Sequence, residues 1–104
     1  MYIPLGKVEI LEEKIKDYLL LPKAKNDKSK FLGELGYSMA NWNELESDII
    51  KLVEENETYL QRSTPFGDMY VVKGKLKNFD VVTIWLLTIG HDKFRFITLY
   101  PNKK

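Results

Sequence analysis

The last third of the chain alternates with a period of two, and this pattern restricts it to β-strands. The stretch from Asp68 to Pro101 reads DMYVVKGKLKNFDVVTIWLLTIGHDKFRFITLYP. Because residues two apart share a face of a strand, we expect two distinct faces. The expected core face carries Val82, Ile84, Leu86, Ile97 and Leu99. The opposite face would carry Thr83, Trp85, Phe96, Thr98 and Tyr100.

Helical periodicity precedes these strands. Apolar stripes predict helices at residues 11–20, 28–35 and 42–55. Period-two runs predict antiparallel strands near residues 58–63, 69–77, 79–88 and 94–100. The expected fold is therefore α+β, with three N-terminal helices packed on a four-stranded antiparallel meander. A chain of this length, residues 1–104, forms a single domain.

The composition excludes several kinds of site. The absence of cysteine excludes a disulfide scaffold, a thiolate zinc site and cysteine catalysis. The single histidine, His91, excludes an acid–base scheme with two histidines and is either a general base or a solvated turn residue. Acidic side chains follow one surface of the third helix instead of converging, so no metal or other cofactor is expected.

Charge and hydropathy leave the class of partner open. The net charge of +1 creates no global field that would indicate a nucleic acid or a membrane. A local patch can still bind RNA. The first ten residues, MYIPLGKVEI, lack the apolar segment of a signal peptide, and no apolar run approaches a membrane span. We therefore expect a cytoplasmic protein without membrane contact.

A basic cluster comes before and within the second expected helix. It consists of Lys23, Lys25, Lys28 and Lys30, with Asp27 between them. Lysines at a helix N-terminus oppose the helix dipole, which makes Lys28 and Lys30 candidates for holding phosphates. A solvated loop and helix start is the alternative.

The face with aromatic rings and hydroxyls is the other candidate site. Aromatic rings stack nucleic-acid bases at roughly 1–3 kcal/mol per base, and hydroxyls donate to phosphates. The strands also carry cations, namely Arg62, Lys73, Lys75 and Arg95. The alternative is a second hydrophobic layer, covered by the N-terminal segment or by a partner in a homodimer.

Several segments resemble a family of short bacterial proteins classified as a domain of unknown function. The most specific are TPFGDMYVV from Thr64 to Val72 and RFITLYP from Arg95 to Pro101. Others are KIKDYLL from Lys14, KSKF from Lys28, the segment from Leu35 to Trp42, and Thr83 to Trp85. Members resemble toxins and are often encoded beside a small antitoxin.

The resemblance implies a bacterial toxin with an architecture similar to that of the barnase, colicin and RelE ribonucleases. It implies a metal-independent endoribonuclease in which a 2′-hydroxyl attacks the adjacent phosphate. Catalytic roles would fall on Lys28, Tyr70, Thr83, Thr98 and Tyr100, and RNA would be bound by Lys30, Arg62, Trp85, Arg95 and Phe96. The expected partners are an RNA substrate and a small cognate antitoxin.

Two alternatives to an enzyme remain at this point. One is a non-catalytic module that binds a protein, as an antitoxin or immunity protein does. The other is a structural homodimer that buries Trp85 and Tyr100.

Overall fold

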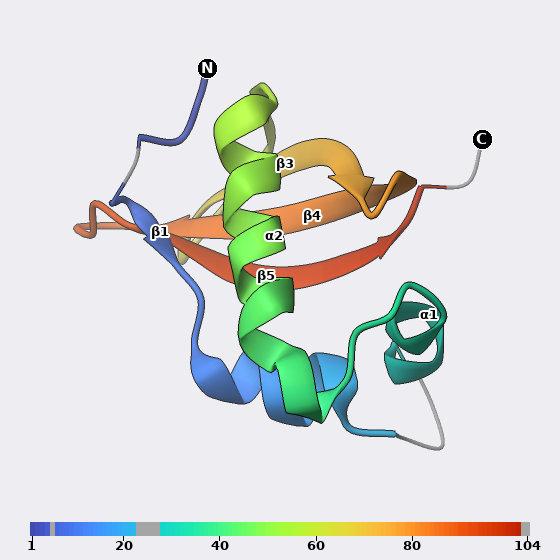
Figure 1. The fold of residues 1–104 in the computed structure, drawn as a ribbon. Coiled ribbons are helices and arrows are strands. Elements are labelled where there is room, and N and C mark those ends of the chain that lie inside the picture. Colours follow the sequence, from blue (N-terminus) through green and yellow to red (C-terminus); the bar gives the residue numbers. More distant parts are fainter. Residues whose placement is uncertain (5, 23–27, 103–104) are drawn as a thin grey trace.

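The computed structural model describes residues 1–4, 6–22 and 28–102 (Figure 1). The N-terminal part holds the short strand β1 (Val8–Glu9), the π-helix η1 (Lys14–Leu20), α1 (Ser29–Glu34), the 3₁₀ turn η2 (Met39–Asn41) and the long helix α2 (Trp42–Glu55). The C-terminal part holds β2 (Thr58–Thr64), β3 (Gly67–Leu76), β4 (Phe79–Thr88) and β5 (Phe94–Pro101). Two lysines of the basic cluster, Lys23 and Lys25, lie outside the described residues.

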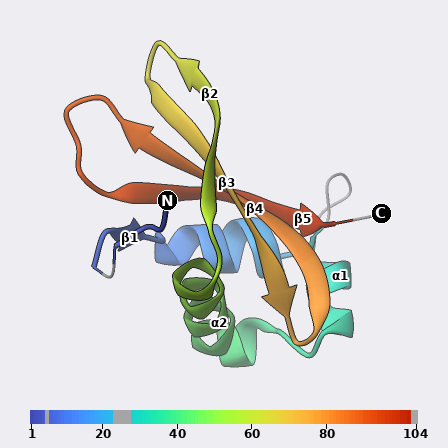
Figure 2. The ribbon, with the colours of Figure 1, turned by 90° about the horizontal axis from the view of Figure 1, so that it is seen from above.

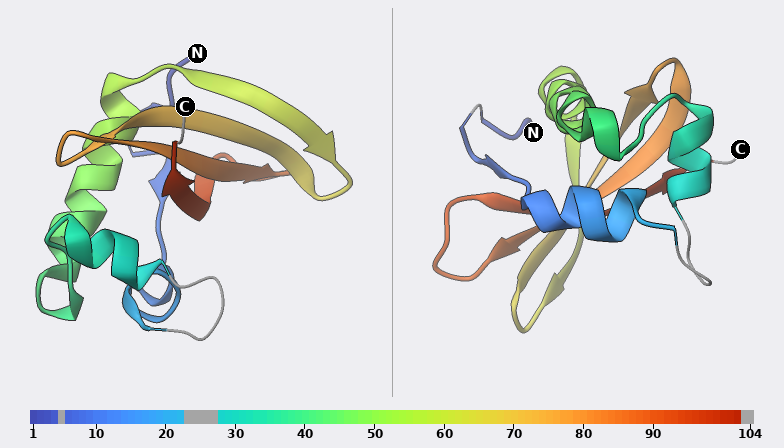
Figure 3. Two further views of the ribbon diagram at one scale, coloured as in Figure 1. Left: turned by 90° about the vertical axis from the view of Figure 1, so that its right-hand side faces the viewer. Right: turned by 60° about the horizontal axis from the view of Figure 1, so that its bottom comes forward.

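The strands form one sheet in the order β1-β5-β4-β3-β2. The four long strands are antiparallel, and β1 is parallel to β5. Their directions fan strongly from β2 to β5, as the twist of strands requires (Figure 2). The helices gather on one side of the sheet, and no helix of the described residues crosses the other side (Figure 3).

The core lies between the sheet and the helices. Trp85 and Phe96 meet edge to face there, with ring centroids 5.3 Å apart. The helices contribute Ile15, Leu19, Leu20, Leu32, Leu45, Ile49, Leu52 and Val53, and the sheet contributes Val72, Leu76, Val81, Trp85, Phe94, Phe96 and Leu99. The apolar stripe that predicted α2 is the stripe that packs on the sheet.

The expected fold of three N-terminal helices on a four-stranded antiparallel meander is wrong. The sheet has five strands and is mixed, because Val8 and Glu9 pair in parallel with Phe94 and Arg95. This pairing satisfies backbone groups at the outer edge of β5, where the Phe94 N–H also donates to the Lys7 carbonyl. Only α2 is long, since η1 and α1 span seven and six residues.

The expected assignment of faces on β4 is also inverted. Thr83 and Trp85 point into the core and are fully buried, although a threonine was expected to face solvent. The Thr83 hydroxyl donates to the Val72 carbonyl at 2.8 Å and accepts from the Trp85 indole N–H at 2.8 Å. Both buried polar groups are therefore satisfied, which removes the cost of burying them.

A β-bulge in β5 explains a second error. Trp85 pairs with Phe96 while Ile84 pairs with Thr98, so Ile97 is an extra residue. Phe96 and Leu99 are three apart yet both lie in the core. Strict alternation had placed them on opposite faces.

Gly74 lets α2 approach β3 closely. A Cβ added at Gly74 would lie 2.7 Å from Leu52 Cγ and 2.7 Å from Asn56 Nδ2. Glycine inside a strand often marks such a close approach.

Replacing Gly74 with alanine should therefore destabilise the protein by about 1–3 kcal/mol, because an added methyl overpacks the contact with α2. Chemical denaturation measures this free energy of unfolding. Gly33→Ala is the matched control, since a Cβ at Gly33 meets nothing within 4 Å. Because Gly33 is the second-last residue of the short helix α1, that change should stabilise by at most about 1 kcal/mol. Equal effects of both substitutions would contradict the close approach.

Candidate functional site

The face of the sheet away from the helices, here called the open face, is defined by strand pairing. Val81, Thr83 and Trp85 point into the core, so the alternate residues of β4 point to the other side. Their cross-strand partners share that side. Three adjacent rows result, formed by Met69, Leu86 and Arg95, by Tyr59, Val71, Ile84 and Thr98, and by Lys73, Val82 and Tyr100. Arg62 joins this side opposite Met69.

The aliphatic centre of the open face is shielded, although no helix covers it. Val82 is 4% exposed and Ile84 is 6% exposed. Because Lys73 and Tyr100 flank Val82 in the sheet, their side chains are the ones placed to close over it. Solvent therefore meets the rims of this face and not an aliphatic patch.

The exposed groups on the open face are tyrosine rings and cations. Tyr59 is 57% exposed and Tyr100 is 40% exposed. They lie on β2 and β5, three strand spacings apart, which corresponds to roughly 15 Å across the sheet. Arg62 and Lys73 are exposed and have no ion-pair partner among the described residues. Arg95 pairs with Glu9 at 3.1 Å.

A neighbouring carboxylate favours the protonated phenol of Tyr59. Its hydroxyl donates to the Glu57 carboxylate at 3.1 Å. That carboxylate raises the pKa of Tyr59, through the hydrogen bond first and then through its charge. A tyrosine is neutral at physiological pH without such a contact, and the upward shift leaves the ring neutral.

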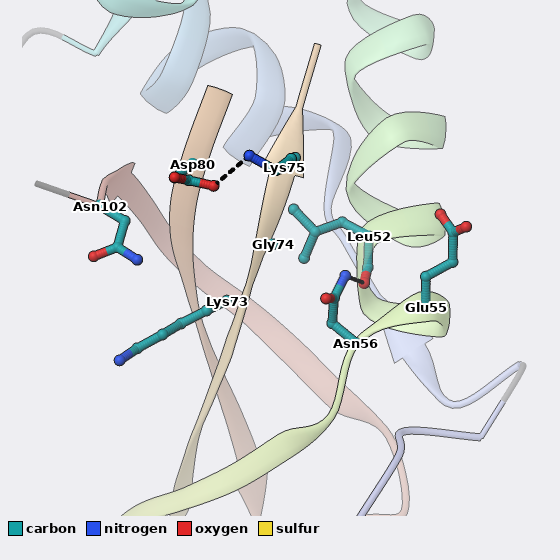
Figure 4. A pocket seen from close by; sticks show the side chains of 8 residues that line it. All are labelled: Leu52, Glu55, Asn56, Lys73, Gly74, Lys75, Asp80 and Asn102. Carbon is teal, nitrogen blue, oxygen red and sulfur yellow. Dashed lines mark hydrogen bonds and ion pairs between the residues drawn. The ribbon is translucent and has the colours of Figure 1, made fainter. Parts of the chain in front are cut away.

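A polar cleft adjoins one end of the open face (Figure 4). Its volume is about 440 Å³. It lies between the end of α2 and the edge of β3 that extends beyond β2, and its lining comprises Leu52, Glu55, Asn56, Lys73, Gly74, Lys75, Asp80 and Asn102. Lys75 pairs with Asp80 at 2.9 Å, and the Asn102 N–H donates to the Asp80 carbonyl. Lys73 belongs to both the cleft and the open face.

Four of the predicted site residues lie on the helix side of the sheet. Thr83, Trp85 and Phe96 are fully buried in the core. Tyr70 is half-buried and packs edge-on against Phe94, with ring centroids 5.1 Å apart. Trp85 and Phe96 are therefore not available to stack bases in this structure.

Lys28 and Lys30 lie at the start of α1, which is also on the helix side. Lys28 is half-buried and precedes the helix, and Lys30 is exposed. Phe31 of the same helix meets Phe79 at 5.1 Å between ring centroids. The structure does not bring these lysines onto the open face.

The remaining predicted residues belong to the open face or its border. Arg62, Arg95 and Tyr100 lie on it. Thr98 lies at the border, where its hydroxyl shares a 2.8 Å hydrogen bond with the Tyr18 hydroxyl. Lys14 supports this contact, because its ammonium donates to the Ile97 carbonyl at 3.2 Å and lies 4.5 Å from the centre of the Tyr18 ring.

Sequence reasoning did not select the ring of Tyr59 or the polar cleft. Tyr59 carried no local signal, since its face follows only from pairing with Val71. Gly74 was a usable signal for the cleft, because a glycine inside a strand often marks a close approach by another segment.

Neither a metal site nor a membrane span is found in the described parts of the chain. Within residues 1–4, 6–22 and 28–102, no three acidic or histidine side chains gather closely enough to hold a metal ion. None of the helices there is long and apolar enough to cross a membrane.

These features define a small α+β domain with one covered and one open sheet face. The sequence profile of a domain of unknown function, DUF6883, matches residues 4–103, and the chain belongs to this family. No curated protein and no solved structure matches the chain. The match confirms membership of a family of unknown function and does not test the toxin character, the antitoxin or the likeness to ribonucleases.

Replacing Thr83 with valine tests whether this residue is structural. The change leaves the indole N–H of Trp85 buried without an acceptor, which should cost about 1–3 kcal/mol in the free energy of unfolding. Thermal and chemical denaturation measure the loss. Thr88→Val is the control, because Thr88 is half-buried near the end of the same strand. Unchanged stability of Thr83→Val would contradict the structural role.

Proposed function

We propose that this domain binds single-stranded RNA across the open face. The observation that supports the proposal is the combination of two exposed tyrosine rings with Arg62 and Lys73, which have no ion-pair partner among the described residues, on a sheet face that no described helix covers. Unstacked bases are commonly held on aromatic side chains of an exposed sheet.

The tyrosines supply the stacking surfaces. Tyr59 and Tyr100 occupy different strands and different rows, so a strand that contacts both must run obliquely over the shielded Val82 and Ile84. Stacking tolerates any base because every base has a π-face. The rings therefore provide affinity without strong sequence preference.

The cations supply contacts to phosphates. Arg62 lies near Tyr59 on β2, and Lys73 lies in the row of Tyr100. Among the described residues, neither Arg62 nor Lys73 has an ion-pair partner that it would have to release before it contacts a phosphate. A modest net charge is compatible with such local binding.

The burial pattern favours RNA over a homodimer. An obligate dimer interface gains its energy from apolar area removed from water. On this face the aliphatic residues Val82 and Ile84 are only 4% and 6% exposed in the monomer, so binding of a second copy would remove little further apolar area from water. A non-catalytic complex with another protein is an outcome that the binding experiment below can report.

RNA cleavage, growth inhibition and neutralisation by a small antitoxin remain predictions. Of the expected catalytic residues, Tyr100 lies on the open face and Thr98 at its border. The Thr83 hydroxyl is enclosed and hydrogen-bonded on both sides, so it cannot reach a phosphate without unfolding of the core.

Alanine at both Tyr59 and Tyr100 should weaken binding to a short oligouridine by about tenfold per ring, because each stacked base is lost. Fluorescence anisotropy at fixed salt measures the affinity. Phe66→Ala is the control, since Phe66 is an exposed aromatic in the turn between β2 and β3 and belongs to none of the rows of the open face. If the control weakens binding as much as the tyrosine variants do, the open face is not the site.

Lys73→Ala should lower the slope of log K against log salt by about 0.7, the value for one phosphate contact with a single strand. Lys51→Ala on the exposed side of α2 is the matched control. A slope that stays the same in Lys73→Ala would contradict a phosphate contact. Tight binding of a protein from the native host, without any RNA binding, would replace the RNA proposal with the protein-binding alternative.

If the domain also cleaves RNA, cleavage should persist in EDTA, since the proposed chemistry uses side chains only. Incubation of total RNA with the purified protein, with and without the chelator, provides the measurement. Lys28→Ala tests the catalytic role predicted for that lysine, and Lys51→Ala, an exposed lysine of α2 with no predicted role, is its control. Loss of cleavage in EDTA would contradict a metal-independent mechanism.

A further inference from the structure

We infer that Lys14 of the helix η1 positions the stacking ring of Tyr100 by holding the β-bulge of β5 in place. The inference rests on the proposed RNA binding and adds a positioning residue to it. Lys14 acts through the backbone of β5 and does not contact the RNA, which separates its role from that of Arg62 and Lys73.

The bulge decides which side of the sheet Tyr100 faces. Phe96 is fully buried in the core, and strict alternation from it would place Tyr100 on the core side as well. Ile97 is an extra residue in the pairing of β5 with β4, and such a bulge re-aims the side chains that follow it. Leu99 therefore enters the core, and Tyr100 lies on the open face.

The regular hydrogen-bond ladder does not fix the backbone at this bulge. Ile97 has no pairing partner in β4. On the other side of β5, the described part of β1 pairs only with Phe94 and Arg95. Because a bulge leaves its extra residue unpaired and disrupts the ladder locally, the conformation at Ile97 depends on contacts from outside the sheet.

The helix η1 supplies these contacts. The Lys14 ammonium donates a 3.2 Å hydrogen bond to the Ile97 carbonyl, and it lies 4.5 Å from the centre of the Tyr18 ring. Four residues further along η1, the Tyr18 hydroxyl shares a 2.8 Å hydrogen bond with the Thr98 hydroxyl. A hydrogen bond from a charged group is stronger than a neutral one, so Lys14 makes the stronger of the two contacts.

A stacking ring contributes most when it is held in position before the ligand arrives. Ordering a mobile segment at the moment of binding lowers the affinity, and a site whose supporting contacts are loose loses its geometry. Tyr100 follows Ile97 by three residues in the same strand. Freedom at the bulge would therefore move the ring, and Lys14 sets the affinity at Tyr100 without contacting a base.

Replacing Lys14 with methionine removes the ammonium and keeps an unbranched side chain of similar length. Binding of oligouridine should weaken about threefold, less than the roughly tenfold loss for Tyr100→Ala, because the ring is loosened and not removed. Lys14→Arg should restore most of the affinity, since a guanidinium can also donate to the Ile97 carbonyl. Lys16→Met on the same helix is the matched control, because Lys16 pairs with Glu12 at 3.0 Å. This control should bind as tightly as the unaltered protein.

Two readouts distinguish positioning from a direct contact with RNA. The slope of log K against log salt should be the same in Lys14→Met as in the unaltered protein, whereas loss of a phosphate contact lowers it by about 0.7. In the Tyr100→Ala background, Lys14→Met should cause no further loss of affinity, because no ring remains to be positioned. A lowered slope, or an equal loss with and without Tyr100, would overturn the inference.

Relaxation dispersion of the ¹⁵N-labelled protein without RNA tests the anchor itself. Lys14→Met should show microsecond-to-millisecond exchange at the amides of Thr98, Leu99 and Tyr100, and Lys16→Met should not. Unchanged amides in Lys14→Met would overturn the inference. If Lys14→Met is poorly folded by circular dichroism, Lys14→Gln, which is also uncharged, takes its place in every comparison.

The measurement without ligand also separates this inference from the proposed function. If the unaltered protein binds no oligouridine while Lys14→Met loosens β5, RNA binding is overturned and the anchoring of Tyr100 by Lys14 stands. If RNA binds through Tyr59 and Tyr100 while Lys14→Met changes neither affinity nor exchange, the proposed function stands and the positioning role is overturned. Absence of both effects overturns both.

Discussion

The hydrogen bond from the Trp85 indole N–H to the Thr83 hydroxyl allows both residues to be buried on the core side of the sheet. The Thr83 hydroxyl in turn donates a hydrogen bond to the Val72 carbonyl. Strands β3 and β4 are therefore joined by a side-chain contact as well as by backbone hydrogen bonds. With both polar atoms satisfied, the largest ring of the sheet is buried against Phe96 and the helices. Because side chains alternate along a strand, the burial of Thr83 and Trp85 also decides which residues of β4 and its neighbours face the other side of the sheet.

Once that side is chosen, the two faces take on different physical characters. The covered face holds aromatic and aliphatic side chains from sheet and helices. The other face has a shielded aliphatic centre at Val82 and Ile84, with tyrosine rings and cations around it. Such a surface can interact with planar, negatively charged ligands and still remain hydrated.

Strand positions were predictable, but the orientation of their faces was not. The turn signals on either side and the apolar, β-branched run between them located β4, which spans ten residues. Within it, Val81 to Trp85 are all buried, so hydropathy could not distinguish the sides. The bulge at Ile97 changed which residues of β5 face the core. Strand β1 has only two residues, so the sequence could not predict its place in the sheet. Candidate residues chosen by face were therefore divided between core and surface.

The bulge in β2 has a consequence for association between copies. β2 is an outer strand of the sheet, and an outer strand offers unpaired backbone groups to other chains. Its register shifts between Leu60 and Arg62, which interrupts the regular spacing of those groups and places a cation beside the interruption. A regular strand from another molecule cannot match this edge over its full length, so the exposed Leu60 does not sit within a continuous template for aggregation.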